Sequence, residues 1–249
     1  MGRARSSHLE RATRMPVSPE VADLPRRIFS PIARGYDRPA LALSLFQYRR
    51  WHRFLLSRLA LPAGARVLDM ATGTGALAFD LLGSDVRVIG GDITRPMLLR
   101  AQARASALSV DLPLVECTAE APPFGDETFD GIVFAYLVRY VSDVPETLAG
   151  LARLLKPGRV MASLDFAVPQ GLTYPLWRLY TDLLLPAAGR LFSADWRRVG
   201  HFLGPNIRDF YRRWREERLL DSWRECGFPG VQSRRLSLGG AIVIWGTKS

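Results

Sequence analysis

The chain has 249 residues, of which 48% are hydrophobic and 23% charged, and its net charge is +10. This length and composition are typical of one large globular domain with a substantial core. No apolar run approaches the roughly 18 residues that indicate a transmembrane helix, and the basic N-terminus lacks the apolar core of a signal peptide. Cys117 and Cys226 have neither metal-ligand nor disulfide spacing, which favours a reducing, cytoplasmic location.

The positive charge is concentrated at both ends of the chain. Residues 1–66 carry 13 Arg against four acids, residues 67–189 are net acidic, and residues 190–235 carry 11 Arg against six acids. Basic flanks of this kind suit nucleic acid or an anionic membrane surface. Compositional bias explains them equally well, because 32 of the 34 basic residues are Arg.

The first 20 residues are expected to form a disordered basic tail. Residues 1–18 combine four arginines with Ser, Pro and Gly and show no apolar periodicity. From residue 28 onward, apolar side chains recur at helical spacing. We therefore predict a single domain over 21–249 that begins with helices, placed where they can cover one end of a sheet.

The stretch 66–94 has the pattern of a ligand-binding βαβ unit. An apolar run ends at Asp69, small residues form a turn over 71–75, residues 76–82 favour a helix, and a second apolar run leads to Asp92. This succession is typical of the mononucleotide-binding half of a doubly wound sheet. Glycine lets the backbone of such a turn approach a ligand, and the second acid can accept hydrogen bonds from a ribose.

Two cofactor classes fit this unit. The run Gly73-x-Gly75-x-x-Ala78 satisfies the dinucleotide pattern, but in that pattern the first glycine follows the strand almost at once. The spacing D-x-x-x-G-x-G from Asp69 resembles instead the first motif of class I S-adenosylmethionine (AdoMet) methyltransferases, and residues 91–97 resemble their second motif. A βαβ unit without ligand is disfavoured by the acid at both strand ends.

The remaining pattern completes an α/β fold. Strands are expected over 112–116, 131–135 and 160–166, with a helix over 143–155 that stops at a Lys-Pro-Gly turn, and a final strand pair over 227–236 and 241–246. The resemblance implies a doubly wound, Rossmann-like class I methyltransferase. Its seven-stranded sheet is mostly parallel with an antiparallel last strand, and it carries N-terminal helices and a helical substrate lid at about 170–226.

Two segments outside these motifs resemble the UbiE-type quinone C-methyltransferases. The first is FSPIARGYDRPALALSLFQYRRWHR over 29–53, which departs from the family pattern at Ser30, Ala40 and Phe46. The second is YLVRYV over 136–141, which retains Arg139 but has Tyr140 in place of Asn. The resemblance runs from about residue 28 to the end of the chain.

The resemblance implies AdoMet as the cofactor and no metal. Asp92 would hold the ribose, the glycine turn the amino-acid part, and Thr118-Ala119 the adenine edge, although Thr118 stands where Asp or Asn is usual. The full set implied for the cofactor is Asp69, Ala71, Gly73, Thr74, Gly75, Asp92, Ile93, Met97, Thr118, Ala119, Glu120 and Ala135.

The implied reaction is methylation of a ring carbon of a prenylated quinol, such as demethylmenaquinol, in menaquinone or ubiquinone biosynthesis. One phenolic proton must leave, and the candidates that assist are Arg139, Tyr36, Tyr140 and His201. Arg139 is the first of these, because the end of a parallel strand faces the ligand crevice and a guanidinium can stabilise a phenolate or hold a water. The aromatic lid can accept the isoprenoid tail.

Three alternatives stay open. One is an AdoMet enzyme for another small phenol, lipid or sterol. The second is an RNA methyltransferase, although the fourth strand lacks the Asn-Pro-Pro-Tyr-like motif for a flipped base. The third is a non-catalytic AdoMet-binding protein. The expected partner is the quinol rather than nucleic acid, with peripheral contact at the inner face of an anionic membrane as one option. The oligomeric state is left open, a homodimer included.

Overall fold

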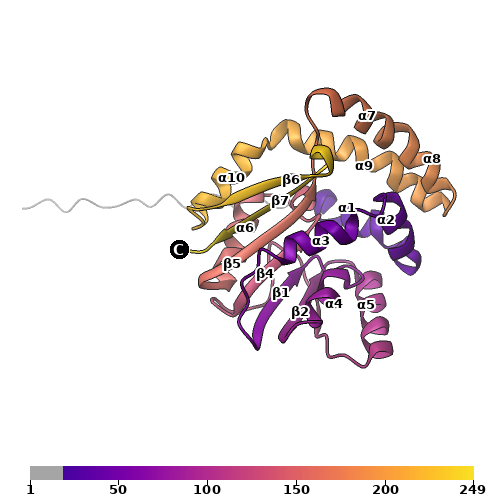
Figure 1. Ribbon diagram of the computed structural model, residues 1–249. Coiled ribbons are helices and arrows are strands. Elements are labelled where there is room, and N and C mark those ends of the chain that lie inside the picture. Colours follow the sequence, from indigo (N-terminus) through magenta and orange to yellow (C-terminus); the bar gives the residue numbers. More distant parts are fainter. Residues whose placement is uncertain (1–18) are drawn as a thin grey trace, which may run out of the picture.

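A seven-stranded sheet forms the centre of the computed structural model, which describes residues 19–249, with side chains from residue 23 onward (Figure 1). The expected tail over 1–20 therefore lies almost wholly outside the described residues. The strands lie in the order β3-β2-β1-β4-β5-β7-β6. They span Ala65–Met70 (β1), Val86–Asp92 (β2), Leu114–Glu116 (β3), Phe129–Ala135 (β4), Leu155–Phe166 (β5), Gln232–Leu236 (β6) and Ala241–Thr247 (β7).

Strands β1 to β5 are parallel, and β7 runs antiparallel to both of its neighbours, β5 and β6. The predicted antiparallel last strand is thus confirmed. The chain winds outward from β1 through β2 to β3 and then returns to the other side of β1 at β4. Ligands of open α/β sheets bind at the carboxyl ends of the strands where the winding reverses, which here is the edge shared by β1 and β4.

Helices cover both faces of the sheet and one of its ends (Figure 1). Those before the sheet are α1 (Pro19–Phe29), η1 (Ala33–Gly35), α2 (Asp37–Leu43) and α3 (Tyr48–Leu56). Those between strands β1 and β5 are α4 (Ala76–Leu82), α5 (Arg95–Leu108), η2 (Val138–Tyr140) and α6 (Val144–Leu154). The region of the predicted lid contains η3 (Gly171–Thr173), α7 (Tyr174–Leu179), the π-helical η4 (Tyr180–Leu184), α8 (Leu185–Arg190), α9 (Ala194–Arg213) and α10 (Glu216–Glu225); η5 (Ser237–Gly239) precedes β7.

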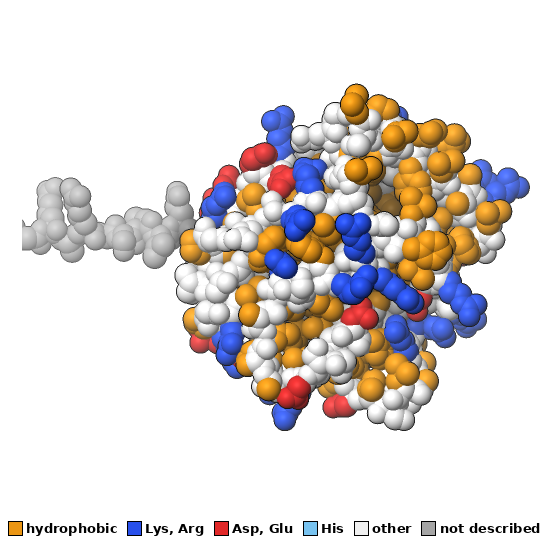
Figure 2. Space-filling model, viewed as in Figure 1, with side chains coloured by type: hydrophobic (Ala, Val, Ile, Leu, Met, Phe, Trp, Pro, Cys, Tyr) orange, Lys and Arg blue, Asp and Glu red, His pale blue; other side chains and the backbone are white. Residues whose placement is uncertain are grey.

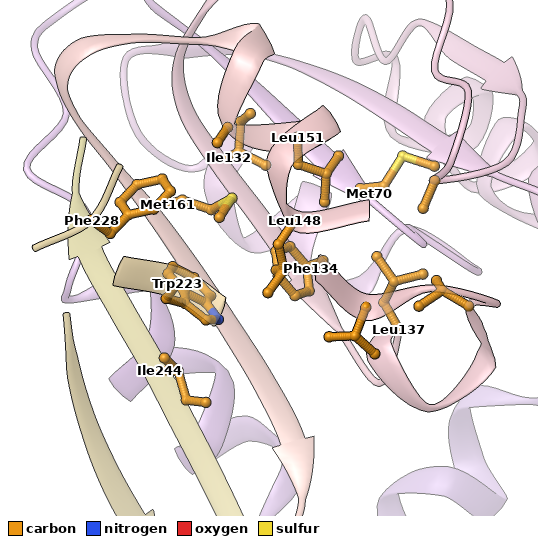
Figure 3. Packing of buried hydrophobic residues seen from close by; sticks show 14 of the residues in the cluster. Met70, Ile132, Phe134, Leu137, Leu148, Leu151, Met161, Trp223, Phe228 and Ile244 are labelled. Atoms are coloured by element: carbon orange, nitrogen blue, oxygen red, sulfur yellow. The ribbon is translucent and has the colours of Figure 1, made fainter. Parts of the chain in front are cut away.

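Buried side chains form separate clusters on the two faces of the sheet. On one face α6 and α10 pack on the strands, and Phe134, Leu148 and Trp223 belong to the same cluster (Figure 3). The rings of Phe134 and Trp223 are stacked, with their centroids 6.2 Å apart. On the other face Leu55 of α3 and Leu77 of α4 pack against the strands. A third, smaller cluster joins the N-terminal helices to α9, and it closes the ligand end of the sheet.

The structure corrects the predicted turn over 156–158. Strand β5 already begins at Leu155, which pairs with Phe129, and the pairing with β4 then shifts register before Gly131. Gly158 adopts a positive φ of 72°, so the expected Pro-Gly turn is an irregularity inside a strand. No helix within the described part of the chain is both long enough and apolar enough to cross a bilayer.

Candidate active site

The glycine turn after β1 is fixed by the two acids at the strand ends. Gly73 donates its backbone N–H to Asp92 Oδ2 at 2.8 Å, and Thr94 donates its backbone N–H to Asp92 Oδ1 at 2.7 Å. Gly75 has a φ of 84°, and a Cβ there would approach the Phe79 ring to 2.7 Å. Only glycine meets both conditions, which explains its place in the turn.

Asp69 is fully buried at the end of β1. The Thr72 hydroxyl donates to its Oδ2 at 2.7 Å, whereas Oδ1 has no hydrogen-bond partner among the residues that the structure describes. Burial raises the pKa of Asp69 to about 7, although the Thr72 hydrogen bond opposes the shift. Burial also raises the pKa of Asp92. Asp69 Oδ1 is therefore an acceptor available to a cationic donor on a ligand.

These strand ends line a cavity of about 130 Å³. All of the residues predicted for the cofactor lie on its wall except Gly75, which shapes the turn behind it. They are Asp69, Ala71, Gly73, Thr74, Asp92, Ile93, Met97, Thr118, Ala119, Glu120 and Ala135. We call this the donor cavity.

A second cavity of about 220 Å³ adjoins the first, and we call it the acceptor cavity. Aromatic and aliphatic side chains of the N-terminal helices and of α7 to α9 form most of its wall, including Trp51, Trp177 and Trp196. The two cavities share a wall of aromatic residues, namely Phe29, Tyr36, Tyr48, Tyr136 and Tyr140. Because these rings border both cavities, a ligand in the donor cavity lies next to a ligand in the acceptor cavity.

Arg139 is the charged residue on the wall of the acceptor cavity. Its side chain is only 1% exposed, and its Nε donates to Asp165 Oδ1 at 2.6 Å. Its Nη1 donates to Asn206 Oδ1 at 2.5 Å and to the Tyr140 hydroxyl at 3.2 Å. Burial lowers the pKa of Arg139, but Asp165 and Tyr140 outweigh burial, so the pKa is raised and the guanidinium stays cationic.

The other predicted proton-transfer residues differ in position. Tyr36 and Tyr140 line both cavities, and burial raises the pKa of each hydroxyl above its ordinary value. Both hydroxyls therefore stay protonated near neutral pH and can donate hydrogen bonds. His201 is exposed and lines neither cavity, because Gly200 and Leu203 occupy the face of α9 that the cavity sees. The structure thus does not bring His201 to the site.

His52 was missed by the sequence analysis. It is 2% exposed, lines the donor cavity and packs against Tyr48 with ring centroids 3.9 Å apart. Neither ring nitrogen has a hydrogen-bond partner within residues 23–249, and Nδ1 lies 3.7 Å from Asp80 Oδ2. Burial lowers the pKa of His52, although Asp80 opposes the shift, so burial favours the neutral form of the ring. Its neighbours in the chain, Trp51 and Arg53, match the family pattern, and this match is the sequence feature that could have pointed to His52.

Solved structures that share this architecture include two methyltransferases. One is a SAM-dependent methyltransferase from Thermotoga maritima, 22% identical, with a TM-score of 0.60 over 90% of this chain and 99% of that one. Another is a phosphoethanolamine N-methyltransferase from Haemonchus contortus solved with S-adenosylhomocysteine, 14% identical, with a TM-score of 0.61 over 87% of this chain and 59% of that one. The fold is that of the class I, AdoMet-dependent methyltransferases, and the glycine turn lies at the site predicted for their cofactor.

The chain belongs to the ubiE/COQ5 methyltransferase family, whose model matches residues 20–248. It is 34% identical to the ubiquinone/menaquinone biosynthesis C-methyltransferase UbiE of Desulfotalea psychrophila, over 89% of each chain. It is 33% identical to the demethylmenaquinone methyltransferase of Tropheryma whipplei strain Twist, over 88% of this chain and 89% of that one. The resemblance read from the two segments at 29–53 and 136–141 is confirmed.

Proposed function

We propose that the protein transfers the methyl group of AdoMet to a ring carbon of a prenylated quinol such as demethylmenaquinol, in menaquinone or ubiquinone biosynthesis. The observation that carries this proposal is the acceptor cavity. Most of its wall is aromatic or aliphatic, and the one charged side chain among its described lining residues is the buried Arg139. A hydroquinone ring with an isoprenoid tail matches a cavity of that kind. The printed names of the relatives support the same acceptor.

The donor cavity fits AdoMet by the chemistry of its wall. Asp69 Oδ1, which lacks a partner among the described residues, suits the cationic amino group of the ligand. Asp92 suits the ribose hydroxyls, while Ile93, Met97 and Ala119 offer apolar surface to the adenine. When bound, AdoMet supplies an electrophilic methyl group on a sulfonium.

Arg139 performs the electrostatic part of the reaction. A ring carbon attacks more readily when the neighbouring phenol has lost its proton, so the site must stabilise a phenolate oxygen. The guanidinium stays charged, and Asp165 and Asn206 fix its orientation. Tyr36 and Tyr140 stay protonated and add hydrogen-bond donors on the same wall.

A second acceptor class is favoured by one observation. Two of the departures from the family pattern, Ala40 and Tyr140, line the acceptor cavity. Tyr140 is larger than the usual Asn and narrows the wall beside Arg139. Another small phenolic, lipid or sterol-like ring is therefore the alternative acceptor. Nucleic acid is not proposed, because the acceptor cavity is largely apolar.

For location, we propose a cytoplasmic enzyme that works peripherally at the inner face of an anionic membrane.

Methyl transfer from labelled AdoMet tests the proposal directly. The purified protein is incubated with demethylmenaquinol carrying a short isoprenoid tail, and the products are separated and identified by mass spectrometry. We expect one added methyl group on the ring and none when the acceptor is omitted. A parallel panel of simple phenols and sterols tests the alternative. Tight AdoMet binding without a methylated quinol would contradict the proposal.

A further inference from the structure

Most of the exposed large hydrophobic side chains lie in one region. Within the described residues thirteen such side chains are exposed, and ten of them come from three segments. They are Leu45 and Phe46 after α2, Leu172, Leu176, Leu179, Leu183, Leu184, Leu191 and Phe192 in and around α7 to α8, and Leu238 in η5. We call this set the leucine surface. Figure 2 shows hydrophobic side chains gathered where Figure 1 places α7, α8 and α2.

The leucine surface has helical periodicity. The elements α7, η4 and α8 follow one another without a break over residues 174–190. One side of this run is buried at Thr181, Leu185 and Gly189. The opposite side is exposed at Leu176, Leu179 and Leu183, at intervals of three or four residues. Leu172 and Leu191, just before and just after the run, are exposed as well. On a surface helix that contacts only water, the exposed side normally carries polar residues.

The acceptor cavity opens at the leucine surface. Trp177, Tyr180 and Leu185 line the cavity from the helical run that carries the exposed leucines. Leu45 lines the cavity as well and is 64% exposed, so the wall reaches the surface there. The Tyr180 hydroxyl donates to the carbonyl oxygen of Leu43, which connects α2 to the lid at this opening.

Helices α2 and α3, which supply part of the wall of the acceptor cavity, also carry arginines without ion pairs. Residues 33–53 contain five Arg and one Asp. All five arginines are exposed, and no carboxylate within the described part of the chain lies within ion-pair distance of them. Arg38 lies on α2, and Arg49 and Arg50 lie on α3. An apolar helix face bordered by cations is complementary to acyl chains beneath anionic headgroups. A second copy of the chain would bring like charges together and cover the opening.

We propose that the leucine surface docks on an anionic bilayer, with the run from α7 to α8 lying in the plane of the interface. In this orientation the acceptor cavity opens into the lipid phase, and Arg38, Arg49 and Arg50 contact the headgroups. The inference rests on the proposed function for the identity of the acceptor, a prenylated quinol that resides in the bilayer. Binding to lipid is a separate property that can be measured without acceptor.

Vesicle flotation without any quinone tests the docking. The vesicles contain phosphatidylglycerol and phosphatidylcholine, or phosphatidylcholine alone. The triple variant Leu176→Gln, Leu179→Gln, Leu183→Gln is compared with the matched control Leu99→Gln, Leu108→Gln, whose leucines are exposed on α5. We expect the triple variant to lose about tenfold or more of its partitioning and the control to keep the parent value. The variant Arg49→Gln, Arg50→Gln should lose binding only to the anionic vesicles.

Fold and chemistry are followed in the same variants. Circular dichroism melting and methylation of a short-tailed acceptor in detergent should match the parent protein, since none of the three leucines lines a cavity. Equal vesicle binding by the triple variant and the parent would overturn the proposal, as would a parent protein that does not float. A parent dimer in sedimentation that the triple variant converts to monomer would assign the surface to a second copy instead. Failure of the proposed function would show only as absent methylation.

Discussion

At the scale of single residues, Arg139 shows how the site holds a charge away from water. A buried charge is destabilising unless it is paired and hydrogen-bonded. The partners of Arg139 come from three places in the chain: Tyr140 beside it, Asp165 on β5 and Asn206 on α9. The same side chain therefore links the sheet to the lid and faces the acceptor cavity.

Arg139→Lys keeps the charge and removes the planar fork. A lysine amine cannot maintain the three hydrogen bonds in their present directions. We expect kcat for the quinol to fall roughly 100-fold, while the dissociation constant for AdoMet measured by calorimetry stays within about threefold of the parent value. The matched control is Arg153→Lys, an exposed arginine paired with Asp126. Parent-like kcat in Arg139→Lys would remove Arg139 from the proposed chemistry.

Much of the wall of the donor cavity could be predicted from the sequence, because short, consecutive motifs supply it. The turn and its flanking acids lie within 24 residues, from Asp69 to Asp92, so local spacing carries the information. His52, Asp165 and Asn206 could not be assigned in this way. Asn206 meets Arg139 across 67 positions in the chain, and only the packing of α9 brings the two together. For His201, the sequence does not reveal which face of α9 would be buried.

At the scale of elements, the close approach of α8 and α9 fixes the position of the lid. A Cβ on Gly200 would lie 2.6 Å from Pro186 Cα, and one on Gly189 would lie 2.6 Å from the carbonyl oxygen of Trp196. Both contacts are with backbone, which cannot move aside as a flexible side chain does. The sequence predicted that this region is helical. It could not predict that Gly189 on α8 and Gly200 on α9 let the two helices touch, because no short-range pattern relates these two segments. Strand β5 likewise begins early because Leu155 pairs with Phe129 of the neighbouring strand.

Gly200→Ala should separate α8 from α9. We expect the free energy of unfolding to fall by about 2 kcal/mol, as in other overpacked interiors. The KM for the acceptor should rise, because Gly200 also lines the acceptor cavity. Urea unfolding and steady-state kinetics measure the two effects. Gly150→Ala on α6 is the control, since a Cβ there meets nothing within 4 Å, and helix propensity should then leave stability equal or higher. Equal stability of both variants would show that the lid adapts freely.

At the scale of the whole molecule, a buried acid couples folding to pH. Burial raises the pKa of Asp69 from 3.8 to about 7. Between these values the folded chain holds a proton that the unfolded chain has released. Stability from this group is thus fully present below pH 3.8 and is lost as the pH rises toward 7.

Asp69→Asn should remove this dependence. The free energy of unfolding of the variant minus that of the parent should grow by on the order of 3 kcal/mol as the pH rises from 4 to 7, because only the parent loses the contribution of Asp69. Urea titrations at a series of pH values measure it. Asp130→Asn provides a control of opposite sign, because Lys156 lowers the pKa of Asp130 and its contribution is lost as the pH falls. Parallel pH profiles for the parent and Asp69→Asn would refute the assignment.

The two cavities draw on different parts of the gene. Residues 69–141 supply most of the donor cavity, whereas the acceptor cavity is built mainly from residues before 52 and after 165. Mutations in either flank can therefore alter the ring or tail that is accepted while the methyl source is retained. In such a chain, substitutions in the two flanking segments can change the acceptor during evolution while the methyl-donor site is inherited unchanged.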